Sequence, residues 1–108
     1  MTQELEHKII MDFNSDIEEL DECLTTLLNE YDESDYKDFN IFFEQGYYRG
    51  QLKELQEWFN RIEYRIERDI EYLKYLNQEK AKHNNNLYLE VLGRFLDIEA
   101  LELIRNYN

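Results

Sequence analysis

The sequence contains no proline and only three glycines. Proline ends or kinks helices and glycine weakens them, so almost nothing in this chain interrupts a helix, and tight turns are few. Cys23 is the single cysteine, so no intrachain disulfide can form, and we expect a reducing, cytoplasmic location. No stretch approaches the roughly 18 apolar residues of a membrane span, and residues 1–7 do not resemble a signal peptide.

The usual signatures of catalysis are also missing. The chain has no glycine-rich phosphate loop, no GxSxG, no CxxC and no HExxH motif. Glu4 and His7 form one Glu-x-x-His unit, but di-iron bundles need a second such unit and two further carboxylates. Cys23 lies among acidic residues, which raise the pKa of a thiol and make it a poor nucleophile. We therefore expect no enzyme activity, no metal site and no cofactor.

What the sequence does contain is helical periodicity. Between Gln3 and Tyr31, apolar residues recur three and four positions apart for three heptads, the spacing of coiled-coil-like packing. Two heptad positions are occupied by Ile10, Ile17, Leu24 and Tyr31 and by Phe13, Leu20 and Leu27. The same spacing returns after residue 51 as Leu52, Leu55, Phe59, Ile62, Ile66, Leu73 and Leu76. Asp69 interrupts this second series, and we expect the neighbouring Ile70 to take its place in the core.

These patterns predict an all-α fold, namely one domain over residues 1–108 that forms an antiparallel bundle of three long helices. The expected helices are 3–31, 36–82 and 87–106, with a loop at the asparagines of residues 83–86. Gly46 and Gly50 can break the second helix at 46–50, which would give four helices. Helix 87–106 is apolar on most of its surface, so we expect it in the middle of the bundle or in a homodimer interface.

Charge is distributed very unevenly. Residues 1–45 hold fourteen acids and two bases, whereas residues 46–108 hold eleven acids and ten bases. The net charge of −13 argues against direct binding to nucleic acid or to an anionic membrane, because both would repel the chain. Such a strong asymmetry between the two parts of a sequence points to an interaction surface.

The acids of the first helix and the following turn form one candidate surface. It comprises Asp12, Asp16, Glu18, Glu19, Asp21, Glu22, Glu30, Asp32, Glu33, Asp35 and Asp38. Several are like-charge pairs three or four residues apart, which together cost about 1–2 kcal/mol of helix stability at low salt. Carboxylates one helical turn apart repeat every ~6 Å, within a factor of two of the ~3.4 Å spacing of phosphates along a DNA strand. The alternative is an ordinary solvated face of an acidic protein.

A second stripe is cationic and aromatic and lies on the expected second helix. It consists of Trp58, Arg61, Arg65, Arg68, Tyr72 and Tyr75, again three and four residues apart. Such a face could stack on single-stranded nucleic acid. The interpretation we favour is that its arginines pair with the chain's own carboxylates, either on the same helix, as Arg65 with Asp69, or on the acidic first helix.

These features favour a small, non-enzymatic inhibitor or regulator whose acidic face mimics DNA or RNA. Its partner would be a basic, nucleic-acid-binding protein, and aromatic residues near the acids would supply the buried anchors of the interface. The candidate anchors are Tyr31, Tyr36, Phe39, Phe43, Tyr47 and Tyr48. In size, charge and helicity the chain resembles the small acidic antagonists of phages and mobile elements, including anti-CRISPR and anti-restriction proteins. The alternative is a self-associating helical adaptor or assembly protein whose acids only keep it solvated.

Overall fold

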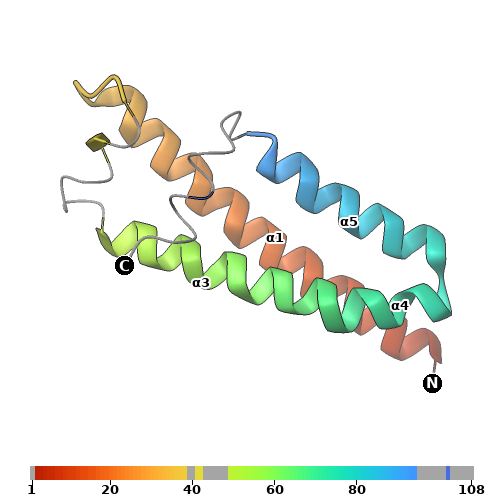
Figure 1. Cartoon of the computed structure of the whole chain (residues 1–108). Coiled ribbons are helices and arrows are strands. Elements are labelled where there is room, and N and C mark those ends of the chain that lie inside the picture. The colour runs from red at the N-terminus through yellow and green to blue at the C-terminus, as the bar shows by residue number, and fades with distance from the viewer. Residues whose placement is uncertain (1, 39–40, 43–48, 95–101, 103–108) are drawn as a thin grey trace.

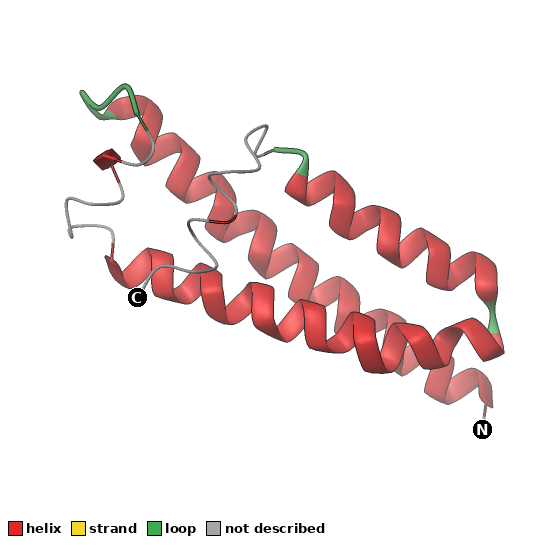
Figure 2. Cartoon of the chain, in the orientation of Figure 1, coloured by secondary structure: helices red, strands yellow, loops and turns green. Residues whose placement is uncertain are grey.

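The computed structural model describes residues 2–38, 41–42, 49–94 and 102, and all regular structure within them is helical (Figures 1 and 2). The elements are α1 (Thr2–Glu33), α3 (Arg49–Arg65), a π-helical turn (Ile66–Ile70), α4 (Glu71–Leu76) and α5 (Gln78–Leu92). Figure 1 shows that α3, the π turn and α4 form one continuous rod that runs antiparallel to α1, and that α5 turns back beside them. The predicted all-α antiparallel bundle is confirmed.

Helix α1 is the longest element and supplies one side of the core. At 32 residues it is about 48 Å long, close to the 52 Å length of the whole molecule. Its buried apolar residues are Ile9, Phe13, Ile17, Leu20, Leu24 and Leu27, while Ile10 and Tyr31 are partly buried against them. Each fully buried side chain of this kind contributes roughly 1.5–3 kcal/mol relative to an exposed one. The heptad pattern read from the sequence therefore marks the packing face.

The rod opposite α1 buries the second series of apolar residues, with one adjustment at Asp69. Position 69 lies seven residues after Ile62, so a regular α-helix would turn it toward the core. The π turn takes more residues per turn and rotates the chain less, so Ile70 is fully buried and Asp69 stays at the edge of the core. This confirms the prediction that Ile70 replaces Asp69 in the packing, and the π turn supplies the physical reason.

The turn between the second and third helices lies earlier than predicted. Helix α4 ends at Leu76, Asn77 is extended (φ −162°, ψ 97°), and α5 begins at Gln78. The Asn77 side chain accepts a hydrogen bond from the Lys80 backbone N–H at 3.3 Å and so caps α5. The expected helix 36–82 and the loop at 83–86 are therefore wrong, since residues 83–86 lie inside α5 and Asn84 is buried there.

The link from α1 to α3 also differs from the sequence prediction. Residues 34–38 are not helical, so no helix begins at Tyr36, and α3 begins at Arg49. The Ser34 hydroxyl donates to the Tyr31 carbonyl at 2.6 Å and accepts from the Tyr36 backbone N–H at 3.3 Å. Gly46 and most of the expected break at 46–50 lie outside the described residues.

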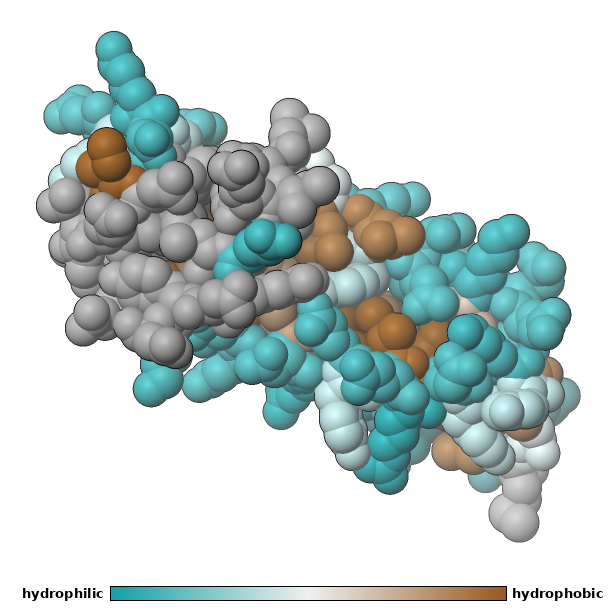
Figure 3. All heavy atoms as spheres, viewed as in Figure 1, coloured by the Kyte–Doolittle hydropathy of each residue, from teal (hydrophilic) through white to brown (hydrophobic). Residues whose placement is uncertain are grey.

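The third helix is shifted toward the N-terminus relative to its expected range. Instead of 87–106, α5 covers Gln78–Leu92, and most of residues 95–108 lie outside the described part of the chain. Tyr88 and Val91 are buried in the core, whereas Leu89 is exposed. In the view of Figure 3, apolar atoms show in the band between α5 and the α3–α4 rod, surrounded by hydrophilic side chains. None of the helices described is both long and apolar enough to cross a membrane.

Candidate functional site

The acidic residues of α1 divide into an inward-facing set and an outward-facing set. Asp16 is 6% exposed, and its carboxylate accepts a hydrogen bond from the Nε of Arg65 on α3. Arg65 Nη1 also lies 3.8 Å from Asp12 and 3.3 Å from Asp69. Arg65 therefore contacts three carboxylates, two on α1 and one in the π turn of the opposing rod. This confirms the favoured interpretation that arginines of the cationic stripe pair with the chain's own acids, at least for Arg65.

A second arginine, Arg94, lies just after α5 and contacts α1. Arg94 Nη1 lies 3.1 Å from an Asp21 carboxylate oxygen and donates to the Thr25 hydroxyl at 3.4 Å. Asp16 is buried, and Asp12 and Asp21 are already paired within the chain. Of the expected acidic surface, Asp16 is therefore turned inward, whereas Asp12 and Asp21 remain partly exposed with their charges paired to arginines of the same chain. The arginines responsible lie 49 and 73 residues away from Asp16 and Asp21 in sequence, too far for helical spacing to reveal.

Glu18, Glu19 and Glu22 form the outward-facing set, and we call them the acidic face. All three are exposed, and none makes an ion pair with any residue that the structure describes. Glu19 and Glu22 line a shallow groove of about 250 Å³ between α1 and α3, with Glu54 on its opposite wall. Three glutamates thus border one groove without a base among its lining residues.

Glu54 is an acidic residue that the sequence prediction did not include. It lies one position before Leu55, at the edge of the apolar stripe of α3, and this position places it beside α1. Its position at the edge of this apolar stripe was the sequence signal that could have identified Glu54. Thirty-two residues separate Glu54 from Glu22, so the two become neighbours only when α3 packs antiparallel to α1.

Further exposed acids surround the C-terminal end of α1. They are Asp32, Glu33, Asp35 and Asp38, while Glu30 is half-buried. The C-terminus of a helix carries partial negative charge, so acids there oppose the dipole, and the last turn of α1 contains no basic residue to compensate. This arrangement lowers the stability of α1 and does not help it to fold.

The candidate aromatic anchors are mostly engaged in packing or lie outside the described residues. Tyr31 packs edge-on against the buried Phe42, with ring centroids 5.2 Å apart, and Tyr36 lies 6.2 Å from the same ring. Tyr31 is partly buried against the core, and Tyr36 is exposed to solvent. The other four anchors, Phe39, Phe43, Tyr47 and Tyr48, are outside the described part of the chain. Of the two expected anchors that the structure describes, Tyr36 is the more exposed and Tyr31 the more buried.

Cys23 faces the groove of the acidic face from α1. Its thiol donates a hydrogen bond to Glu54 Oε1 at 3.5 Å. Burial, followed by the hydrogen bond and charge of Glu54, raises the pKa of Cys23 to about 12, with smaller contributions from Glu19 and Glu22. At neutral pH the thiol is therefore protonated, and the thiolate needed for nucleophilic attack is scarce.

The described residues contain no group of three or more His, Cys, Asp and Glu side chains arranged to hold a metal ion. No protein-family model, curated protein or solved structure matches the chain. The geometry of this molecule and its charges are therefore the basis on which a function can be inferred.

Proposed function

We propose that the chain is a non-enzymatic inhibitor or regulator that inserts its acidic face into the basic cleft of a nucleic-acid-binding protein. In this proposal Glu18, Glu19 and Glu22 occupy the positions that phosphates take in the partner's cleft. The observation that supports it is that all three are exposed and form no ion pair with the described residues, while the neighbouring Asp12, Asp16 and Asp21 each pair with an arginine. The cytoplasm, where such partners are found, is the location that the single cysteine favours.

Two physical arguments support a functional role for these charges. Glu18–Glu22 and Glu19–Glu22 are like-charge pairs on one helix, and each costs a few tenths of a kcal/mol. A solvated face with mixed lysines and glutamates would avoid this cost. Glu54 adds a fourth carboxylate from a second helix, so the negative potential extends across the groove and not only along one rod. Binding to a basic cleft would be accelerated by this field and weakened by salt.

The test compares two triple variants with the same change in net charge. Glu18→Gln, Glu19→Gln and Glu22→Gln neutralise the acidic face, and Glu67→Gln, Glu79→Gln and Glu90→Gln neutralise three exposed glutamates elsewhere. Proteins captured from the native host by the wild-type chain at low salt are purified, and those that bind duplex DNA are tested for displacement of a fluorescent duplex. Far-UV circular dichroism confirms that both variants remain folded.

We expect the wild type and the control variant to displace the duplex equally. Loss of three charged contacts should weaken displacement by the acidic-face variant roughly tenfold to a hundredfold. Displacement should also decrease with added salt. Equal displacement by both variants, or capture of no DNA-binding protein, would contradict the proposal.

One observation favours the alternative of a self-associating adaptor. Leu89, in the last turn of α5, leaves 62% of its surface exposed and could contact a second copy of the helix. An adaptor that pairs through this helix would give a dimer mass by light scattering, and Leu89→Gln would restore the monomer. The acidic-face variant would leave that dimer unchanged, because Glu18, Glu19 and Glu22 lie on another helix.

A further inference from the structure

The connection between α4 and α5 consists of a single residue. Helix α4 ends at Leu76, α5 begins at Gln78, and Asn77 between them has an extended backbone (φ −162°, ψ 97°). Figure 1 shows that the chain reverses its direction here, so that α5 lies back along the rod that it has just left. Helix–helix connections in bundles usually contain about two to eight residues, so this turn is unusually short.

The residues on both sides of Asn77 favour a helix and not a turn. Residues 71–82 contain no glycine and no proline, and most of them are Leu, Lys, Glu, Gln or Ala, which are strong helix formers. The sequence accordingly predicts one helix through residue 82. A helix that ends at Leu76 leaves its last carbonyls without an intrahelical partner, and one that begins at Gln78 leaves its first N–H groups so. If Asn77 were helical, these carbonyls and N–H groups would pair with one another.

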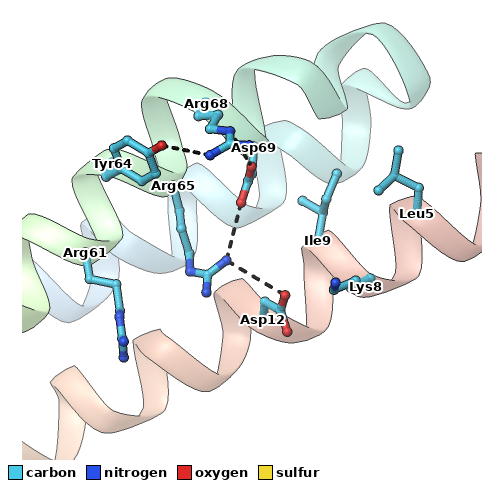
Figure 4. Close-up of a pocket in the computed structure, with 9 residues that line it drawn as sticks. All are labelled: Leu5, Lys8, Ile9, Asp12, Arg61, Tyr64, Arg65, Arg68 and Asp69. Carbon is cyan, nitrogen blue, oxygen red and sulfur yellow. Dashed lines mark hydrogen bonds and ion pairs between the residues drawn. The ribbon is translucent and has the colours of Figure 1, made fainter.

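The other half of the molecule, α1 with the rod that faces it, is held together without α5. Leu20 of α1 and Phe59 of α3 are fully buried in the core. Figure 4 shows Arg65 of α3 directed toward Asp12 of α1, and the same guanidinium also pairs with Asp16 of α1. These ion pairs join α1 to the rod directly. We therefore expect α1 and the rod of one chain to stay together if α5 leaves its place.

Helix α5 packs on the bundle through a smaller and more polar face. Its buried residues are Ala81, Asn84, Tyr88 and Val91. Asn84 is 1% exposed, yet its Nδ2 donates to no residue that the structure describes, which is a costly arrangement for a buried amide. The ion pairs Lys80–Glu6 and Arg94–Asp21 connect α5 and the residues just after it to α1. An α5 supplied by a second copy of the chain would make all of these contacts equally well.

We propose that the chain forms a domain-swapped homodimer, in which Asn77 becomes helical and α5 of each copy packs against α1 and the rod of the other. Arg49–Leu92 is then one helix about 66 Å long. Because the contacts of α5 are retained and the main difference lies at Asn77, this exchange is a low-cost route to a dimer. Helix α5 meets α1 through Glu6 and not through the acidic face, so the inference does not depend on the function proposed for that face.

A cross-link between α1 and α5 distinguishes the swapped dimer from a dimer formed by surface contact. In a Cys23→Ser background, Glu6→Cys and Lys80→Cys place thiols at two positions whose side chains are 2.6 Å apart in the wild type. A short bis-maleimide joins these helices within one chain in the monomer or in a surface dimer. In the swapped dimer it joins α1 of one chain to α5 of the other.

We expect the isolated dimer to run as a covalent dimer on a denaturing gel after cross-linking, and the isolated monomer to run as a monomer. Variants with only one of the two cysteines are the controls and should give no covalent dimer. A cross-linked dimer fraction that runs as a monomer would overturn the proposal.

Variants of the turn should shift the equilibrium in opposite directions. Asn77→Ala removes the cap and favours the continuous helix, whereas Gly-Ser-Gly inserted after Asn77 lengthens the turn and favours the monomer. Asn86→Ala changes an exposed asparagine inside α5 and controls for helix propensity away from the turn. Each protein is refolded from urea over a range of concentrations at physiological salt, because exchange requires α5 to detach, and its mass is measured by light scattering.

We expect Asn77→Ala to lower the dissociation constant of the dimer at least about tenfold relative to the wild type, and the insertion to raise it by a similar factor. Asn86→Ala should leave it close to the wild-type value. Absence of a wild-type dimer at millimolar chain, or equal dissociation constants for Asn77→Ala and Asn86→Ala, would contradict a swap at this turn.

Discussion

At the scale of single residues, Cys23 shows how packing changes a chemical property that the sequence only outlines. The acids around it in sequence predict a raised pKa. In the structure the largest cause is burial, and the next is Glu54, which lies on another helix. Glu19 and Glu22, the neighbours visible in the sequence, contribute least. The direction of the Cys23 pKa shift was therefore predictable from the sequence of α1 alone, but the role of Glu54 was not.

Glu54→Gln should make Cys23 more reactive. Removing the carboxylate lowers the thiol pKa, and the rate of alkylation by iodoacetamide at pH 8 should rise about threefold for each unit of that decrease. Glu57→Gln removes an exposed charge one turn further along α3 and serves as the control. The rate is followed by mass spectrometry of the intact protein. An unchanged rate in Glu54→Gln would show that burial alone keeps the thiol protonated.

At the scale of elements, the asparagines explain why helix boundaries were harder to predict than helix faces. Three asparagines in succession at 84–86 resemble a loop, but Asn84 is 1% exposed inside α5 and the helix continues through it. Asn77 stands alone between Leu76 and Gln78, without glycine or proline, and yet it makes the turn. A single capping residue marks where α5 begins, because its side chain accepts from the Lys80 N–H, one of the first N–H groups that lack a partner within the helix.

Asn77→Ala should therefore destabilise the protein by about 1 kcal/mol, because the Lys80 N–H loses its acceptor. Asn77→Asp keeps an acceptor at the same place and should retain most of the stability. Urea unfolding followed by circular dichroism measures both. A stability of Asn77→Ala equal to that of the wild type would mean that packing of α4 against α5, and not the cap, fixes this turn.

The faces of the helices were predictable because burial follows a period that is written in the sequence. Leu20, Leu24, Phe59 and Ile62 are all fully buried, as their spacing predicts. The acidic face was only partly predictable, since sequence spacing places Asp16 and Glu19 on the same helix but does not show where Arg65 will reach. Pairing across helices depends on register and rotation, and here the π turn also changes the rotation of the rod.

At the scale of the whole molecule, the net charge of −13 opposes the compact state. We expect the melting temperature to rise by a few degrees as NaCl increases from about 0.01 M to about 1 M, since the Debye length falls from about 30 Å to about 3 Å. The acidic-face variant should start from a higher melting temperature at low salt and rise less. A melting temperature that falls with salt would instead indicate that attractive pairs such as Lys80–Glu6 dominate.

The Arg65 cluster has a consequence for the divergence of homologous chains. The Arg65 side chain is 25% exposed and the Asp16 side chain only 8%. A neutral residue at position 65 would therefore leave the buried Asp16 carboxylate without an opposite charge. Positions 16 and 65 should therefore change together, and a homologue with an apolar residue at one should carry an uncharged residue at the other. Glu18, Glu19 and Glu22 form no ion pair with the described part of the chain, so loss of their charge should leave no buried partner charge behind, and these positions should be free to vary unless a binding partner constrains them.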